Sequence, residues 1–426
     1  MSSSVAFHTL GCKLNFAESS DLLRQFVEAG YSVVDFHQKA DIYVINTCTV
    51  TAIAEKKCRT AIRQAIAQNP QAIVAVIGCF AQNNPKSVAQ IEGVSYILGN
   101  HDKHKLLEYI LSGTTAPQTI EEPRSFNLAY SSSDRTRTFF KVQDGCDYFC
   151  TYCAIPFARG RSRSATVAET VAMARQIALS GSKEVVLTGV NTGTFGIHQG
   201  ETFLELLRAL DAVECIERYR ISSIEPNLIT DEIIDFVATS RAFLPHFHIP
   251  LQSGSDKVLK IMHRHYDTAL YANKLERIKS VMPDACIAAD IMAGFNGEDE
   301  TEFQKVCQFV ESLPISYLHV FTYSDRPNTA ALKLGEKIPM NIRRQHSQAL
   351  HDISDHKKKA FYESQIGKER TVLWESTLHT TPAGDMMQGW TDNYIRLQRP
   401  YNASLIGAIT PYPITPETIV ADFETE

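Results

Sequence analysis

Long apolar runs are missing from this chain of 426 residues, and none is much longer than Ala72–Ile77. A membrane-spanning helix needs about 20 such residues, so we do not expect an integral membrane protein. The first residues, Met1–His8, have neither the basic nor the apolar segment of a secretory signal. From these two absences we expect a cytoplasmic protein.

An excess of basic charge is also missing, since 42 Lys and Arg stand against 48 Asp and Glu. The net charge therefore does not indicate a polyanionic partner, and any nucleic-acid contact must use a local basic surface. The chain has no internal repeat and no low-complexity tract. Because 44% of its residues are hydrophobic and 21% are charged, we expect globular domains, two or three for this length.

Three regions differ in their pattern of apolar residues. Residues 1–130 alternate short strands with helices, such as Ala52–Gln68, which is typical of a doubly wound parallel sheet. Residues 135–362 repeat this alternation in six β/α units, with a helix at Val167–Leu179, and fit a closed or a partial barrel. Between these two regions, Ser131–Asp134 reads as a linker.

The third region, residues 365–426, contains only β-strands, separated by Gly, Pro and Asn. This pattern is typical of a small antiparallel β-barrel. We expect its strands at Arg370–Trp374, Trp390–Leu397, Leu405–Ile409 and Thr418–Phe423. The predicted fold class is therefore α/β, with a parallel-sheet domain, a β/α barrel domain and a terminal antiparallel barrel.

Three closely spaced cysteines come directly after the first strand of the middle region. Cys146, Cys150 and Cys153 form a C-x3-C-x2-C loop. Three thiolates on one loop suit a [4Fe–4S] cluster whose fourth iron is left open. A structural zinc site is the alternative, but it needs a fourth Cys or His, which this loop lacks.

This loop, at the start of a β/α barrel, resembles that of the radical S-adenosylmethionine (SAM) enzymes. The resemblance implies that the amino and carboxylate groups of SAM chelate the open iron. It also implies that an electron from the cluster cleaves SAM to a 5′-deoxyadenosyl radical. The barrel would hold this radical near one C–H bond and exclude water.

Three further cysteines, in the first region, also follow predicted strands. Cys12, Cys48 and Cys79 each lie just past the carboxyl end of a strand, and in a parallel sheet those ends share one edge. They can therefore converge and hold a second cluster with an open iron. The alternative is three separate buried cysteines. We assign no ligand role to the remaining four: Cys58, Cys215, Cys286 and Cys307.

With two cysteine triplets and a terminal β-barrel, essentially the whole chain resembles the methylthiotransferases. Their parts are an N-terminal cluster domain, a radical SAM (β/α)6 partial barrel and an OB-like TRAM domain. The similarity includes the segments Asp134–Arg137, Pro156–Ser164 and His248–Ser255. The chain departs from the family at Asn296 and Asn328, where Pro and Gly are usual.

Within the family, the chain is most similar to bacterial enzymes that modify N6-threonylcarbamoyladenosine beside the tRNA anticodon. The segments that carry this similarity are Leu187–Asn191 and Gly389–Arg396. The resemblance implies a reaction with two molecules of SAM, one giving a methyl group to sulfur at the Cys12, Cys48 and Cys79 cluster. The other would yield the radical that removes hydrogen from adenine C2, in a nucleotide unstacked from the anticodon loop.

The implied partners are tRNA, SAM, an electron donor such as flavodoxin or ferredoxin, and a sulfur source. Two sister activities remain open, the methylthiolation of N6-isopentenyladenosine in tRNA and that of a ribosomal-protein aspartate. A different class also remains open, an iron–sulfur protein that only binds RNA or transfers electrons.

Contacts to SAM are expected from residues near the cysteine loop and at strand ends. Tyr152 matches an aromatic position of the family near the adenine, and Thr188 and Gly189 are placed to meet the methionine amino group. Arg264 could pair with the substrate or the SAM carboxylate, or belong to a solvated surface cluster. Polar side chains at later strand ends line barrel active sites or simply cap the strands. In this sequence they are Ser223, Glu225 and Gln252.

A local basic surface is expected in residues 333–370, which hold nine Lys and Arg against five acidic residues. This segment would contact phosphates, although a solvated helix face is the alternative. Arg159, Arg161 and Arg163 follow the cysteine loop, where an RNA strand would approach. Aromatic residues of the terminal barrel would stack on bases or belong to its core. They are Trp374, Trp390 and Tyr394.

Overall fold

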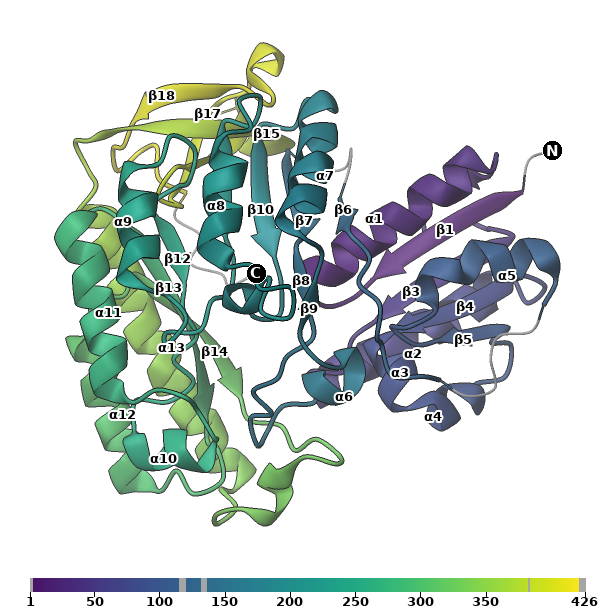
Figure 1. Ribbon diagram of the computed structural model, residues 1–426, viewed down its shortest axis with the longest axis horizontal. Coiled ribbons are helices and arrows are strands. Elements are labelled where there is room, and N and C mark those ends of the chain that lie inside the picture. Colours follow the sequence, from purple (N-terminus) through teal and green to yellow (C-terminus); the bar gives the residue numbers. More distant parts are fainter. Residues whose placement is uncertain (1–2, 115–119, 132–135, 382–383, 421–426) are drawn as a thin grey trace.

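The computed structural model describes residues 3–114, 120–131, 136–381 and 384–420, which form three parts (Figure 1). The N-terminal part is a parallel sheet with the strand order β2-β1-β3-β4-β5. Its strands are β1 (Ser4–Thr9), β2 (Ser32–Val33), β3 (Ile42–Thr47), β4 (Ile73–Gly78) and β5 (Tyr96–Leu98). Its helices are α1 (Lys13–Glu28), α2 (Ala52–Gln68), α3 (Cys79–Asn83), α4 (Pro85–Ala89), η1 (Lys103–Lys105) and α5 (Leu106–Ser112).

Both faces of this sheet are buried, because its central strands are apolar at successive positions. In β3, Ile42 and Val44 pack in one core with Phe26 of α1. The alternate residues Tyr43 and Ile45 pack in a second core with α2. The sheet is therefore doubly wound, as the sequence predicts.

The middle part is an open barrel of six parallel strands. One sheet has the order β11-β10-β7-β6, in which the edge strand β6 is antiparallel, and the other has the order β12-β13-β14. Parallel bridges from Tyr219 to Phe243 and from Ser223 to His248 join the two sheets. Within the described ranges no ladder joins β7 to β14, so the barrel is partial.

The strands of the middle part are β6 (Ala129–Tyr130), β7 (Arg137–Lys141), β8 (Gln143–Asp144), β9 (Arg163–Ser164), β10 (Glu184–Thr188), β11 (Arg218–Ile221), β12 (His246–His248), β13 (Cys286–Ala293) and β14 (Tyr317–Thr322). Its helices are α6 (Ile155–Arg159), α7 (Val167–Leu179), η2 (Thr192–Thr194), α8 (Phe203–Asp211), α9 (Asp231–Thr239), α10 (Asp256–Ile261), α11 (Thr268–Val281), α12 (Glu300–Ser312), η3 (Ala330–Lys333) and α13 (Met340–Glu363). Helices α7 and α8 begin at capping boxes, in which Thr166 and Thr202 exchange hydrogen bonds with Glu169 and Glu205.

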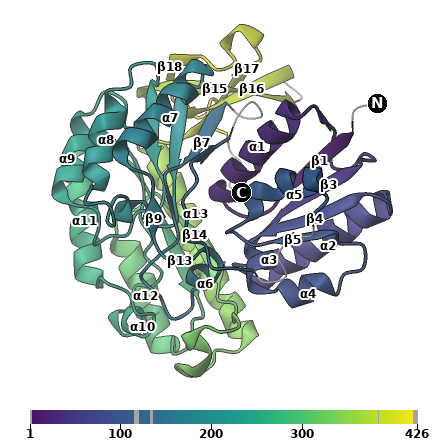
Figure 2. The ribbon, with the colours of Figure 1, turned by 45° about the vertical axis from the view of Figure 1, so that its right-hand side comes forward.

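The N-terminal part covers the open side of the barrel (Figure 2). Helix α1 packs against both β6 and β7. Ala17 of α1 shares a small core with Ala129, Phe139 and Val186 from three barrel strands. Cys12, directly before α1, lines a cavity together with the barrel residues Phe139, Val186 and Thr188.

The C-terminal part is an antiparallel half-barrel with the order β17-β16-β15-β18. Its elements are β15 (Glu369–Thr381), β16 (Gly384–Thr391), β17 (Arg396–Pro400), η4 (Ala403–Leu405) and β18 (Ile409–Pro413). The Glu184 carboxylate accepts hydrogen bonds from Arg218 and Arg220, which also donate to the backbone carbonyls of Thr371 and Thr391. This buried group joins the C-terminal sheet to the barrel.

Three strand predictions for the C-terminal part are wrong in detail. The expected strand Trp390–Leu397 is interrupted by a turn, in which Tyr394 has a φ of +66° and the Thr391 hydroxyl accepts from the Ile395 N–H. Of Leu405–Ile409, Leu405 ends the 3-10 helix η4 and a turn follows, so that only Ile409 belongs to a strand. Of Thr418–Phe423, the described residues form only a bridge from Ile419 to Leu397, and the rest lies outside the described residues.

The two departures from the family pattern have local explanations. Asn328 adopts a φ of +67°, a left-handed conformation that Asn tolerates better than most residues with a side chain. Asn296 is fully buried and donates to the Ala331 carbonyl at 2.8 Å. Across the described residues no helix is both long enough and apolar enough to span a membrane. The predicted linker is described only at Ser131, because 132–135 lie outside the described residues.

Candidate active site

The barrel triplet (Cys146, Cys150 and Cys153) lies on the loop between β8 and α6. Gly145 starts this loop with a φ of +71°, and a Cβ atom there would lie 2.0 Å from the Arg161 carbonyl oxygen. Only glycine therefore fits this position without moving the backbone. The Cys146 N–H donates to the Gly160 carbonyl at 3.1 Å, so the loop folds back onto its own end.

Two sulfur atoms of the barrel triplet accept hydrogen bonds from nitrogen. The Arg264 guanidinium donates to Cys150 Sγ at 3.1 Å, and the Ile155 N–H donates to Cys153 Sγ at 3.4 Å. Burial raises the pKa of Cys146 to about 12, so the free thiol stays protonated until a metal displaces the proton. Nitrogen donors around a cysteine triplet suit a sulfur-ligated, anionic iron centre.

Two of the predicted SAM residues, Tyr152 and Glu225, contact a third, Arg264, beside the barrel triplet. A fourth, Ser223, lies two residues before Glu225. Arg264 is buried, forms an ion pair with Glu225 and donates to the Tyr152 hydroxyl at 3.4 Å. It is not part of a solvated cluster. Ser223 contacts His248 Nδ1 at 3.2 Å, which gives its hydroxyl a partner within the barrel.

Thr188, Gly189 and Gln252 lie on the segments that end barrel strands. A Cβ atom at Gly189 would lie 2.8 Å from Gln143 Oε1, and that oxygen accepts the N–H groups of Val190 and Asn191. The Thr188 hydroxyl is buried, and the described part of the chain gives it no hydrogen-bond partner. Gln252 has a φ of +65°, and its N–H donates to the Asp290 carbonyl. The orphaned Thr188 hydroxyl fits a polar ligand at this edge.

The N-terminal triplet (Cys12, Cys48 and Cys79) gathers at the carboxyl edge of the first sheet. Cys12 caps α1, Cys48 follows β3 and Cys79 begins α3. A Cβ atom at Gly11 would lie 3.1 Å from Cys48 Sγ, which brings the Cys12 and Cys48 segments together. Burial, followed by the negative charges of Cys79 and Cys12, raises the pKa of Cys48 to about 12. The three thiols are therefore close enough to influence each other's ionisation.

Cys58, to which we assigned no ligand role, lies beside this triplet. The Cys48 N–H donates to Cys58 Sγ at 3.4 Å, and the Cys58 thiol donates to the Cys48 carbonyl at 3.5 Å. Cys58 thus holds the Cys48 backbone in place, and it belongs to the core of α2.

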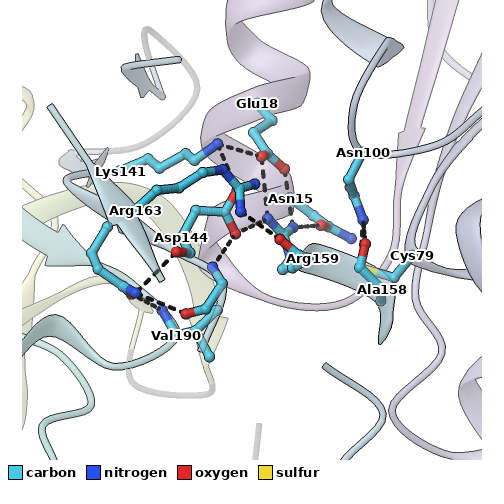
Figure 3. Close-up of polar contacts among 12 residues, drawn as sticks. Asn15, Glu18, Cys79, Asn100, Lys141, Asp144, Ala158, Arg159, Arg163 and Val190 are labelled. Carbon is cyan, nitrogen blue, oxygen red and sulfur yellow. Dashed lines mark hydrogen bonds and ion pairs between the residues drawn. The ribbon is translucent and has the colours of Figure 1, made fainter. Parts of the chain in front are cut away.

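A buried group of charges, the junction charge network, lies where α1 meets α6 and the first strands of the barrel (Figure 3). Its members are Glu18, Lys103, Lys141, Asp144, Arg159 and Arg163. The Arg159 guanidinium donates to Asp144 at 2.9 Å and to Asn15 at 2.6 Å. Burial disfavours ionised Glu18, but Arg159, Lys103 and Lys141 hold its pKa well below the usual carboxyl range.

The junction charge network has four cations and two carboxylates. It adjoins the N-terminal triplet through Asn100, which accepts from Lys103 at 2.7 Å and donates to Cys79 Sγ at 3.5 Å. An excess of buried positive charge needs nearby negative charge to be stable. Three thiolates around an iron–sulfur cluster would supply that charge, so the donors at this site fit such a cofactor.

A cavity of about 730 Å³ lies between the three parts of the molecule. It is lined by Cys12 and Lys13 from the N-terminal part and by Thr188, Gly189 and Ser223 from the barrel. The C-terminal part contributes Trp390 and Tyr394 to the lining, and their rings stack with centroids 4.4 Å apart. This volume lies in the range typical of small-ligand sites.

The expected RNA-contacting residues are only partly available. Arg159 and Arg163 are paired within the junction charge network, so that part of the interpretation is wrong, whereas the side chain of Arg161 is 68% exposed. Trp374 is fully buried and therefore belongs to the core. Of the nine basic residues in 333–370, at least six have partners within the described part of the protein. They are Arg343, Lys357, Lys358, Lys359, Lys368 and Arg370.

Comparison with known proteins agrees with this geometry. Residues 4–99 match the model of the uncharacterized protein family UPF0004, and residues 140–310 match that of the radical SAM superfamily. The chain is 39% identical to the threonylcarbamoyladenosine tRNA methylthiotransferase MtaB of Bacillus subtilis (strain 168), over 96% of this chain and 93% of that one. The chain belongs to the radical SAM tRNA methylthiotransferases.

Two further relatives show how far the family extends. The MtaB enzyme of Aquifex aeolicus (strain VF5) is 38% identical over 93% of this chain and 96% of its own. The tRNA-2-methylthio-N(6)-dimethylallyladenosine synthase of Acetivibrio thermocellus is 30% identical over 94% of this chain and 86% of its own. Among solved structures, the radical SAM methyltransferase TsrM of Kitasatospora setae has a similar fold. The TM-score is 0.57 at 16% identity, over 78% of this chain and 77% of that one.

Members of this family are transferases that use SAM and two [4Fe–4S] clusters as cofactors. In this chain each cysteine triplet offers three sulfur atoms with nitrogen donors beside them, which is a donor set that fits such a cluster. The cofactors expected from the sequence therefore agree with both the family and the local chemistry.

Proposed function

We propose that this chain converts N6-threonylcarbamoyladenosine, next to the tRNA anticodon, into its 2-methylthio derivative. The observation that carries the proposal is the shared cavity, whose lining includes Cys12 of the N-terminal triplet and the predicted SAM residues Thr188 and Gly189. A nucleobase in this cavity lies between the N-terminal triplet and the predicted SAM residues. The extensive similarity to enzymes named for this modification supports the same conclusion.

Within this proposal the two triplets have different roles. Cys146, Cys150 and Cys153 would hold one cluster, and Cys12, Cys48 and Cys79 the other. When bound, the first cluster supplies the electron that cleaves SAM, and the second supplies the site for the methylated sulfur. Two molecules of SAM are consumed for each product, one as methyl donor and one as radical source.

The residues of the chain bind, orient and shield the reactants. Arg264 fixes Glu225 and Tyr152 beside the barrel triplet, and Gln143 fixes the Gly189 segment against the same loop. Helix α1 covers the open side of the barrel and so separates the reacting groups from bulk water. SAM contacts are assigned to seven residues: Tyr152, Thr188, Gly189, Ser223, Glu225, Gln252 and Arg264.

We place the three domains at residues 1–130, 135–362 and 365–426, the last as an RNA-binding TRAM domain. The enzyme would work in the cytoplasm with tRNA, with an electron donor such as flavodoxin or ferredoxin and with a separate sulfur source. Trp390 and Tyr394 line the cavity and are the aromatic residues of that domain best placed to meet the RNA.

The experiment that tests the function uses reconstituted protein, SAM, a reductant and anticodon stem-loops. Three stem-loops carry threonylcarbamoyladenosine, isopentenyladenosine or plain adenosine at the same position, and products are measured by mass spectrometry of nucleosides. We expect a methylthio product from the first stem-loop. A product from the isopentenyl stem-loop alone would contradict the proposal, and so would release of 5′-deoxyadenosine with no methylthiolated nucleoside from any of the three.

A further inference from the structure

The cavity walls carry mostly positive charge, although the whole chain is negatively charged. Five of the lining residues are Lys or Arg, whereas the acidic lining residue is Asp355, which lies exposed on α13. The basic lining residues are Lys13, Arg137, Arg220, Lys358 and Arg396. A cavity of this composition favours a ligand with an anionic group.

Most of these cations already have partners inside the protein. Arg220 is bound by Glu184, with Nε at 2.7 Å from Oε1, and Arg137 contacts Glu375 at 3.4 Å. Lys13 and Arg396 form no ion pair among the described residues, but Arg396 lies over the Trp390 ring. Lys13 is exposed, and its ammonium group is the cavity cation nearest in the chain to the N-terminal triplet. It directly follows Cys12 and begins α1, so the backbone of the N-terminal triplet fixes its position.

A second side chain in the cavity is buried without a hydrogen bond. His246 lines the cavity, is only 8% exposed, and neither ring nitrogen has a partner among the described residues. Its ring lies against that of Tyr394, with the centroids 4.4 Å apart. Burial, then the charges of Arg220 and Lys13, hold the pKa of His246 well below its usual range. The ring is therefore neutral at physiological pH and offers one N–H donor and one acceptor.

The chemistry of the target nucleoside places an anion close to Cys12. The atom that receives the methylthio group is C2 of the adenine, and N6 is attached to the carbon on the other side of N1. If C2 lies at the N-terminal triplet, the N6 side chain lies only a few atoms away. In threonylcarbamoyladenosine that side chain ends in a free carboxylate, whereas an isopentenyl group carries no charge.

We propose that Lys13 and His246 form a subsite that binds the carboxylate of the N6 side chain and thereby selects threonylcarbamoylated RNA. This inference rests on the proposed function and names the residues that set its specificity. Lys13 forms the ion pair, and His246 donates its ring N–H to the carboxylate or to the adjoining hydroxyl. An apolar N6 group leaves the buried His246 without a partner and covers the Lys13 ammonium group without supplying an anion, so it binds less well.

The test compares two anticodon stem-loops that differ in one functional group. One carries threonylcarbamoyladenosine, and in the other the carboxylate is replaced by a neutral carboxamide. We expect kcat/KM of the unsubstituted enzyme to be about 10- to 100-fold higher for the carboxylate, the range for hydrogen bonds to charged groups. Lys13→Gln should lose about the same factor on the carboxylate and change little on the carboxamide, and Lys13→Arg should restore most of it.

Two controls separate this role from others. Lys39→Gln changes an exposed lysine at the far edge of the first sheet and should leave both substrates unaffected. His246→Gln, which is remote from both cysteine triplets in the chain, should also reduce the preference for the carboxylate. Binding of both stem-loops, measured by fluorescence anisotropy without turnover, should show the same preference if Lys13 acts on the substrate rather than on cluster assembly.

Three results would overturn the inference. The first is equal kcat/KM of the unsubstituted enzyme on the two stem-loops. The second is an equal loss of kcat/KM on the carboxylate and the carboxamide stem-loops in Lys13→Gln. If the salt dependence of binding also became smaller, Lys13 would be assigned to an RNA phosphate. The third is loss of the preference in Lys39→Gln as well. Failure of the proposed function looks different, because the unsubstituted enzyme would then methylthiolate neither of these stem-loops.

Discussion

Arg159 and Glu18 form a buried ion pair across the junction of the N-terminal part and the barrel, with 3.1 Å between Nη2 and Oε2. Arg159 ends α6, the short helix that follows the barrel triplet, and Glu18 lies on α1, which follows Cys12. One side-chain contact therefore connects the segments that carry the two cysteine triplets. Its geometry holds the two sites in a fixed relation, on which a reaction shared between them depends.

Replacing Glu18 by Gln should destabilise this junction. The substitution leaves Lys103, Lys141 and Arg159 buried with one carboxylate fewer, and breaking a buried ion pair typically costs about 3–5 kcal/mol. We expect earlier urea unfolding of the N-terminal part and a lower yield of methylthiolated product than of 5′-deoxyadenosine. Glu28→Gln, an exposed substitution on the same helix, is the matched control and should change neither. Equal behaviour of the two variants would contradict this role of Glu18.

Removing one cysteine triplet should abolish a different activity from removing the other. Replacing Cys146, Cys150 and Cys153 by Ala should abolish release of 5′-deoxyadenosine, because SAM has no cluster from which to receive an electron. Replacing Cys12, Cys48 and Cys79 by Ala should abolish methylthiolation and leave SAM cleavage. Both products are measured by mass spectrometry, with Cys215→Ala, an exposed thiol, as control. Loss of SAM cleavage in the second variant with a folded barrel would argue against separate roles.

The fold was predictable where local signals agree with packing. Helices α2 and α7 have the predicted bounds, Ala52–Gln68 and Val167–Leu179, because Thr51 and Thr166 cap an amphipathic segment in each case. The strand expected at Trp390–Leu397 failed because its hydrophobic pattern continues through a turn. That turn depends on Thr391 and on the left-handed Tyr394, which no glycine or proline marks in the sequence.

The site was predictable as far as topology determines it. Cysteines at the ends of parallel strands were expected to meet, because those ends share one edge of the sheet. The junction charge network could not be foreseen, since Glu18 and Arg159 are 141 residues apart and no spacing rule relates them. The different surroundings of His246 and His248, which alternate along one strand, could not be foreseen either. His248 bonds to Asp290 at 2.8 Å, whereas His246 has no partner among the described residues, and only the packed barrel distinguishes them.

Acid should weaken the attachment of the C-terminal part to the barrel. Burial disfavours ionised Glu184, but Arg220, Arg137 and Arg218 outweigh it and lower the pKa of Glu184 below 4.5. A carboxylate with a lowered pKa stabilises the folded state above its unfolded pKa and loses that effect as the pH falls through the folded value. The difference in stability between the original chain and Glu184→Gln should therefore be constant near neutral pH and shrink below about pH 4.5.

Fluorescence can follow this attachment, because the two tryptophans of the chain, Trp374 and Trp390, both lie in the C-terminal sheet. Urea unfolding of the iron-free protein is recorded by tryptophan emission at pH 7 and at pH 4. Glu217→Gln, which removes an exposed partner of Lys183, is the control and should behave like the original chain. If Glu184→Gln lowered the free energy of unfolding by the same amount at pH 4 as at pH 7, the cause of the loss would be packing rather than charge.

Gly145→Ala should prevent assembly of the barrel cluster without unfolding the chain. The new Cβ would lie 2.0 Å from the Arg161 carbonyl oxygen, so the backbone must move just where the loop with Cys146 begins. Gly181→Ala is the matched control, because its φ of +83° imposes the same backbone strain while nothing lies within 4 Å. We expect Gly145→Ala to bind about half the iron of the original chain, since one of two four-iron clusters is lost, and to release no 5′-deoxyadenosine. Gly181→Ala should retain both properties at a small cost in stability. Full iron content in both variants would contradict this prediction. The backbone would then relieve the clash at Gly145 without moving the three cysteines, and the tight loop would not be what positions them.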